Sequence, residues 1–274
     1  MQWLSECHDY ILIYAKKKET WRPNLLERTQ EMNNRYTNRD NDPRGVWKAE
    51  NSTAQAGHGT AKQFYTLKAP NGKEHTLPRG RCWIYTEEVI MRHIADNRIW
   101  FGVAGNNVPA IKRFLTEVKQ GIACKTIWFR TEVGDNQAAT KEIKNLFPEG
   151  ILFTTPKPSS LIERILQIAS VPDSIILDSF AGSGTTAHAA FNKNKADGGN
   201  RKFILVEMEN YADSITAERV KRVIDGYSNV EGTGGDFIYY NPGEALLLQD
   251  GNLNEGVDER KIREYIDYME TKEP

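Results

Sequence analysis

Cysteine and long apolar runs are both scarce in this sequence of 274 residues. Cys7, Cys82 and Cys124 lie far apart and lack the spacing of a metal site or of a disulfide framework. No apolar run approaches the roughly 20 residues that a membrane span needs, and the N-terminus lacks a signal-peptide pattern. The sequence therefore predicts a cytoplasmic protein with reduced thiols, no metal site and no membrane contact.

Net charge is also small, at −1, but the charges are unevenly distributed. Residues 1–130 contain 21 Lys and Arg against 13 Asp and Glu, whereas residues 131–274 contain 15 against 24. All six tryptophans lie in the first of these parts. A basic, aromatic-rich part beside an acidic part suits a nucleic-acid enzyme, because counterion release from phosphates supplies most non-specific affinity. The alternative is a solvated basic surface over a tryptophan-containing core.

A glycine-rich stretch at residues 177–186 organises the second part of the chain. The apolar residues 175–177 predict a short strand, buried on both faces, that ends near Asp178. Gly182 and Gly184 then allow a sharp turn and the close approach of a ligand. Helix-compatible residues follow, so the loop amides are expected to face a ligand above the helix N-terminus.

An acidic residue follows the next predicted strand. That strand covers residues 203–206 and ends at Glu207, which is 23 positions after Gly184. This is close to the roughly 20 residues expected for a carboxylate that binds ribose hydroxyls. The order of strand, loop, helix, strand and acid predicts a nucleoside-cofactor site.

Two cofactors compete for this site. Residues 182–187 match G-x-G-x-x-A, the loop that binds the pyrophosphate of a dinucleotide. Asp178 argues against that ligand, because a carboxylate repels a pyrophosphate but suits the sulfonium and ammonium groups of S-adenosylmethionine. A glycine turn that serves only strand-to-helix packing is the third possibility.

Residues 178–186 resemble the cofactor loop of DNA amino-methyltransferases whose motifs run in permuted order, with the catalytic segment first. Residues 155–158, with Leu161 and Ile162, resemble the segment that covers the methionine end of the cofactor. The resemblance extends to the modification subunit of type III restriction systems. The stretches that carry it are residues 8–16, 80–83, 98–102, 106–109, 126–129, 134–138, 198–203 and 234–237.

The resemblance implies an α/β fold: a Rossmann-like S-adenosylmethionine-dependent methyltransferase sheet with an inserted mixed α/β target-recognition region. Residues 1–24 would add a strand to the methyltransferase sheet, 25–135 would form the recognition insertion, 136–230 the cofactor-binding half, and 231–274 a C-terminal extension. The cofactor-binding residues implied are Thr155, Lys157, Pro158, Asp178, Phe180, Ala181, Gly182, Ser183, Gly184, Thr185 and Glu207.

The activity implied is methyl transfer from S-adenosyl-L-methionine to N6 of adenine in a specific DNA sequence. Cytosine N4 methylation, a dinucleotide oxidoreductase and a non-catalytic DNA-binding remnant remain as alternatives. The partners implied are double-stranded DNA, a second modification subunit and a restriction subunit.

A catalytic loop is missing from the pattern. Such enzymes use Asp, Asn or Ser followed by Pro-Pro and an aromatic residue, which position the flipped base. The eleven prolines here include no adjacent pair, and residues 241–243 are no substitute. We therefore expect no catalytic residue in this chain, an incomplete portion of a larger enzyme, exposed sheet edges and association with a complementing catalytic segment.

Residues 8–15 predict a central strand with Tyr10 and Tyr14 in the core. Apolar spacing predicts helices over residues 86–96, 109–120, 139–147, 160–170, 212–225 and 258–269. In these helices Lys112 and Arg219 are expected on outer faces. His188 is expected to pack or form hydrogen bonds rather than to catalyse.

Overall fold

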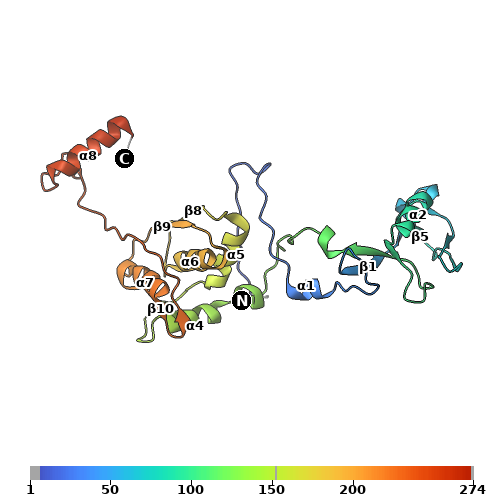
Figure 1. Cartoon of the computed structure of the whole chain (residues 1–274). Coiled ribbons are helices and arrows are strands. Elements are labelled where there is room, and N and C mark those ends of the chain that lie inside the picture. The colour runs from blue at the N-terminus through green and yellow to red at the C-terminus, as the bar shows by residue number, and fades with distance from the viewer. Residues whose placement is uncertain (1–6, 152, 273–274) are drawn as a thin grey trace, which may run out of the picture. The chain divides into compact units, whose positions relative to one another are not determined.

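The computed structural model describes residues 7–151 and 153–272, which divide into two compact units. The first unit contains the described residues up to Trp128 together with Gln167–Ser170, and the second contains Phe129–Leu166 and the chain from Val171 onward. Helices and short strands occur throughout, so the predicted mixed α/β class is confirmed (Figure 1). None of the helices described is long and apolar enough to cross a membrane.

The first unit is built on antiparallel strands. Its elements are α1 (Gln30–Asn34), β1 (Trp47–Asn51), β2 (Thr53–Gln55), β3 (Leu67–Lys68), β4 (Glu74–His75), β5 (Arg81–Trp83), α2 (Glu87–Ala95), β6 (Ile99–Trp100) and β7 (Ala110–Phe114), with 3-10 turns at Ala56–His58, Ala61–Gln63 and Leu115–Glu117. β1, β7 and β6 form one sheet in that order, while β2 pairs with β5 and β3 with β4. Trp83, Ile90 and Phe101 lie in its apolar core, and α2 packs against this core through Ile90.

The prediction of a helix over residues 109–120 is wrong, because this segment contains strand β7 followed by the 3-10 turn at Leu115–Glu117. β7 pairs with β1 along its whole length, with Trp47 opposite Phe114, and with β6 on its other side. Lys112 and Phe114 are both buried, which is the two-residue period of a strand. Pairing on both sides outweighs the helical spacing of the apolar residues, since intrinsic propensity is a weak influence beside tertiary contacts.

The second unit contains a parallel strand–helix–strand unit. Its elements are α3 (Arg130–Val133), α4 (Asn136–Leu146), α5 (Ser159–Ala169, counted in the first unit from Gln167 on), β8 (Ile175–Asp178), α6 (Thr185–Asp197), β9 (Lys202–Leu205), a π-helical turn (Ala212–Ala217), α7 (Glu218–Asp225), β10 (Gly226–Tyr227), β11 (Val230–Glu231) and α8 (Glu259–Thr271). β8 and β9 pair in parallel, with Asp178 opposite Leu205. The helices predicted over 86–96, 139–147, 160–170, 212–225 and 258–269 are thus confirmed within a few residues.

The sheet of β8 and β9 is covered on one face only, so the prediction of a strand buried on both faces is wrong. Ile176 and Phe203 pack against a core that contains Ala190 of α6. On the opposite face, Ile175 is 68% exposed and Leu177 is 65% exposed. The described part of the chain provides no layer over that face, which is why these apolar side chains meet solvent.

The strand predicted over residues 8–15 does not form in the structure. Tyr10 is 74% exposed and Tyr14 is 87% exposed, so neither is a core residue. No strand of the described chain pairs with this segment, and an extended apolar segment without a pairing partner gains no ladder hydrogen bonds.

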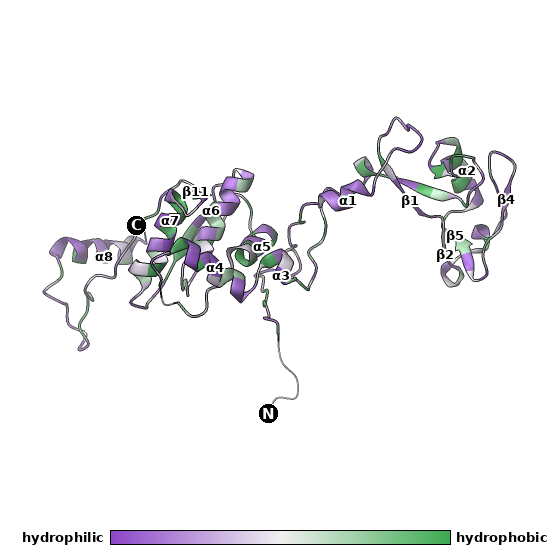
Figure 2. Ribbon diagram, turned by 90° about the horizontal axis from the view of Figure 1, so that it is seen from below, coloured by the Kyte–Doolittle hydropathy of each residue, from purple (hydrophilic) through white to green (hydrophobic). Residues whose placement is uncertain are grey.

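Helix α8, near the other end, is largely hydrophilic (Figure 2) and has no buried residue.

Candidate functional site

The glycine-rich loop joins β8 to the first turn of α6, as the sequence predicts. Gly182 and Gly184 have φ angles of 54° and 79°, a region that residues with a Cβ rarely adopt. A Cβ built on Gly184 would lie 2.9 Å from the carbonyl oxygen of Thr216. Glycine is therefore required at position 184 both for its dihedral angles and for its lack of a side chain.

The backbone amides of this loop are already engaged within the protein. Ala181 N donates to Val206 O at 3.1 Å, and Gly184 N donates to Ala181 O at 2.8 Å. Gly182 N donates to the Glu207 carboxylate at 2.7 Å. A pyrophosphate-binding loop presents free amides to its ligand, whereas three amides here have internal acceptors, one of them an anion.

Two carboxylates are fixed beside the loop. Asp178 accepts from Phe180 N at 3.2 Å and from the Thr186 hydroxyl at 2.6 Å. Glu207, besides its bond to the loop, accepts from Met208 N at 2.9 Å and from Glu209 N. A carboxylate has about four acceptor positions, so Glu207 retains capacity for a ligand hydroxyl. The arrangement suits a cationic ligand that carries hydroxyl groups.

The segment at residues 155–158 meets the same loop. The Thr185 hydroxyl donates to the carbonyl oxygen of Lys157 at 3.3 Å. Thr155 and Lys157 are exposed and Pro158 is buried. Phe180 is 86% exposed at the start of the loop. The structure therefore brings together the loop, the segment at residues 155–158 and Glu207.

Three of the predicted site residues in the loop have buried side chains. Ala181, Ser183 and Thr185 are each 6% exposed or less. The Ser183 and Thr185 hydroxyls accept hydrogen bonds from Arg219 of α7, at 2.9 and 2.8 Å. Arg219, predicted on an outer face, is fully buried, and that prediction is wrong. The available signal was its position four residues before the buried Val223, on the same side of the helix.

Glu142 of α4 completes this buried cluster. It pairs with Arg219 and accepts from the backbone and hydroxyl of Ser159, at 3.2 and 2.8 Å. His188 Nδ1 lies 3.1 Å from both Glu142 and Arg219, which confirms its predicted role in hydrogen bonding. Burial alone would raise the pKa of Glu142, but His188, Arg219 and Ser159 outweigh it and lower that pKa to about 2.

A groove of about 1420 Å³ is lined by β9 and by Glu207. Its other wall includes residues 233–242, among them the exposed Tyr240. Phe191 and Val220 add apolar surface to it. A largely apolar groove beside a fixed carboxylate has room for a nucleoside whose hydroxyls reach Glu207.

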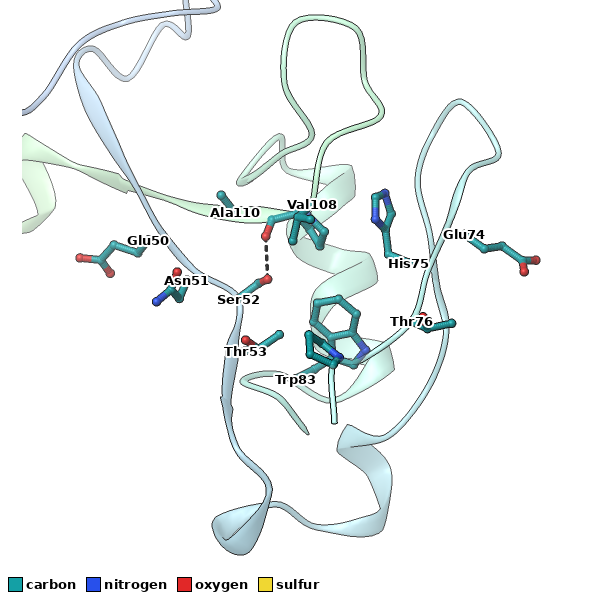
Figure 3. Close-up of a pocket in the computed structure, with 12 residues that line it drawn as sticks. Glu50, Asn51, Ser52, Thr53, Glu74, His75, Thr76, Trp83, Val108 and Ala110 are labelled. Carbon is teal, nitrogen blue, oxygen red and sulfur yellow. Dashed lines mark hydrogen bonds between the residues drawn. The ribbon is translucent and has the colours of Figure 1, made fainter. Parts of the chain in front are cut away.

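A second cavity, of about 470 Å³, lies in the first unit (Figure 3). The Ser52 hydroxyl donates to Pro109 O at 2.6 Å beside it. Glu50 and Glu74 contribute to its lining, and its described lining residues include neither Lys nor Arg, so it does not suit phosphate. Burial lowers the pKa of His75, whose Nε2 has no hydrogen-bond partner among the described residues.

Comparison with known proteins decides the family. A family model described as DNA methylase, covering N6 and N4 methyltransferases, matches residues 3–218, which include the loop, Glu207 and Glu142. The chain belongs to the DNA methylase family. The predicted resemblance to DNA amino-methyltransferases is confirmed, and the reaction class of this family is methyl transfer to an amino group of DNA.

Methylases of restriction–modification systems are among the similar proteins. The Mod subunit of the type III enzyme StyLTI from Salmonella typhimurium is 32% identical over 240 residues, which are 78% of this chain and 34% of that protein. The EcoP15I Mod subunit from Escherichia coli is 26% identical over 81% of this chain and 38% of its own length. The type II methyltransferase M.KpnI from Klebsiella pneumoniae is 40% identical over 46% of this chain and 29% of that protein. The chain spans about a third of the length of these relatives.

Proposed function

We propose that this chain forms the cofactor-binding and DNA-recognition parts of a restriction–modification methyltransferase that acts on N6 of adenine. The observation that carries the proposal is the loop at residues 178–186, between two parallel strands and beside the carboxylates of Asp178 and Glu207. These carboxylates attract the sulfonium and ammonium groups of S-adenosylmethionine and repel a pyrophosphate. The engaged loop amides favour the same choice.

The residues present fit this cofactor in charge and in shape. Those proposed to hold it are Thr155, Lys157, Pro158, Asp178, Phe180, Ala181, Gly182, Ser183, Gly184, Thr185 and Glu207. Glu207 would accept from the ribose hydroxyls, while Asp178 would face the cationic end. Ser183 and Thr185 act through the shape of the loop, because their side chains are buried. S-adenosylmethionine, when bound, supplies an electrophilic methyl group. The fold proposed around it is a Rossmann-like methyltransferase sheet.

The proposed recognition region is residues 25–135. Lys62, Lys68, Lys73 and Arg79 are exposed on and near the β3–β4 hairpin. Cations on one exposed hairpin are suited to phosphate contacts, which set the position of a protein on DNA. The first unit also carries the excess of positive charge in the sequence. These features support DNA as the macromolecular substrate.

The target atom and the partners are proposed from similarity to Mod subunits of type III enzymes. Adenine N6 is the first candidate, and cytosine N4 is the alternative that uses the same cofactor loop. A restriction subunit, a second modification subunit and a complementing catalytic segment are the proposed partners. The chain itself contains no adjacent proline pair, so no residue is proposed for catalysis.

Calorimetric titration with S-adenosylmethionine and with NAD tests the cofactor. We expect S-adenosylmethionine to bind and NAD not to bind. Asp178→Asn should weaken binding about tenfold, since a tenfold change is about 1.4 kcal/mol. Asp173→Asn, at an exposed carboxylate before β8, is the matched control and should bind as the unmodified chain does. Binding of NAD without S-adenosylmethionine would refute the proposal.

Transfer of labelled methyl groups to mixed-sequence DNA tests the enzymatic part. The chain alone should bind DNA in a salt-dependent manner without incorporation, and a complementing Pro-Pro segment should restore incorporation. Identification of the methylated base separates adenine N6 from cytosine N4. Incorporation by the chain alone would contradict the absence of a catalytic loop. DNA binding without cofactor binding would favour a non-catalytic remnant.

A further inference from the structure

We infer that Arg219 and Glu142 are positioning residues that hold the glycine loop in its ligand-binding shape. The inference rests on the proposed cofactor site, which it deepens. Arg219 lies on α7 and Glu142 on α4, and both elements are distant in sequence from the loop. Neither residue belongs to the predicted cofactor contacts. Their effect is exerted through the loop residues they touch.

Arg219 contacts the loop on its buried side. Its Nη1 donates to both Ser183 Oγ and Thr185 Oγ1, and the guanidinium is fully buried. These hydroxyls flank Gly184, whose φ angle of 79° sets the direction of the loop. A planar guanidinium bonds both hydroxyls and a carboxylate at fixed angles, which an ammonium group does not reproduce.

Glu142 connects Arg219 to the segment at residues 155–158. It pairs with Arg219 through one oxygen and accepts from Ser159 through the other. Ser159 directly follows the segment at residues 155–158, whose Lys157 carbonyl accepts from Thr185. One partly buried ion pair therefore connects the loop to this segment and fixes both.

His188 occupies the space between the two charged groups. Its Nδ1 is 3.1 Å from Arg219 Nη2 and 3.1 Å from Glu142 Oε1. A ring nitrogen either donates or accepts, so only one of these contacts is a hydrogen bond at any time. Arg219 Nε has no hydrogen-bond partner among the described residues. A buried donor without a partner lowers the free energy of unfolding. Stability alone therefore does not account for the cluster, and positioning of the loop does.

The test combines ligand titration with hydrogen exchange and thermal unfolding of the full chain. Arg219→Lys retains the charge beside Glu142 but loses the forked bonds to Ser183 and Thr185. We expect about tenfold weaker binding of S-adenosylmethionine, with faster exchange of the amides in residues 178–186. Arg222→Lys is the matched control, because Arg222 lies on the same helix and pairs with Glu149 and Glu218 instead.

A second variant approaches the contact from the loop. Ser183→Ala with Thr185→Val removes the two acceptors and leaves Arg219 and Glu142 in place, so it remains informative if Arg219→Lys does not fold. It should weaken S-adenosylmethionine binding and accelerate loop exchange to a similar extent. Unchanged loop exchange in folded variants would overturn the inference. If the unmodified chain fails to bind S-adenosylmethionine, the proposed function fails, while faster loop exchange in the variants still supports positioning.

Discussion

Lys112 and Arg219 are two buried cations, one in each unit, and they serve different structures. Lys112 lies on β7, pairs with Asp40 and Asp42, and sits over the ring of Trp47 at 5.3 Å. Its contacts are with strands and with the loop that precedes β1. Arg219 contacts the loop of the candidate cofactor site. The residues that a buried charge contacts therefore indicate its role, since burial alone is common to both.

The two clusters also differ in how completely they are bonded. Asp42 is held by Lys112 at 3.1 Å and by Arg44 at 2.8 Å, which lowers its pKa against the effect of its burial, the bonds from Arg44 contributing most. Arg219, in contrast, has a buried Nε without a partner in the described chain.

Lys112→Met should have the largest effect. It removes the cation that Asp40 and Asp42 share and leaves Asp42 with Arg44 alone, and breaking a buried pair typically costs about 3–5 kcal/mol. Denaturant unfolding followed by tryptophan fluorescence measures it, because all six tryptophans lie at or before Trp128. Binding of S-adenosylmethionine should be unchanged. Loss of cofactor binding in the folded variant would show that the two clusters are coupled.

Acidification should act through Glu142. Its pKa falls from 4.5 to about 2 on folding, so the stability it contributes is complete above pH 4.5 and is lost as the pH falls toward 2. This difference corresponds to about 3 kcal/mol. Thermal unfolding by circular dichroism across this range measures it. Glu142→Gln should be less stable at pH 7 and should flatten the acid limb; an unchanged slope would contradict the assignment.

Gly184→Ala should have an intermediate effect. It combines an unfavourable φ angle, at about 1 kcal/mol, with a contact of 2.9 Å to Thr216 O, so the loop must shift. We expect about tenfold weaker cofactor binding by titration. Gly198→Ala is the matched control, because Gly198 has a φ of 69° but no atom within 4 Å of a built Cβ. Equal effects of the two variants on binding would argue against the contact.

Arg260→Ala should have the smallest effect. Arg260 and Glu264 form an exposed pair on α8, with side chains 86% and 62% exposed. Exposed pairs of this kind contribute little, so the unfolding midpoint should not change measurably. Thermal unfolding in parallel with Lys112→Met gives the comparison. A marked loss of stability would indicate that α8 packs against the protein in solution.

The sequence predicted the local elements of the site better than its interior. The loop around Gly184, both parallel strands and Glu207 follow from residue order, because glycine positions and short apolar runs act locally. Lys112 and Arg219 were placed on outer faces, since charged residues are mostly exposed. Their burial depends on Asp42 and Glu142, whose proximity is set by tertiary structure. The helix predicted over residues 109–120 was wrong for the same reason, because β7 forms through its pairing with β1 and β6.

The self-bonded loop has a kinetic consequence. Gly182 and Gly184 have their amide partners before any ligand arrives, so the conformational entropy of ordering this backbone is lost during folding and not at binding. A ligand that docks there meets a rigid surface. Its association is then expected as a single step whose observed rate rises linearly with ligand concentration, without the plateau that a slow rearrangement imposes.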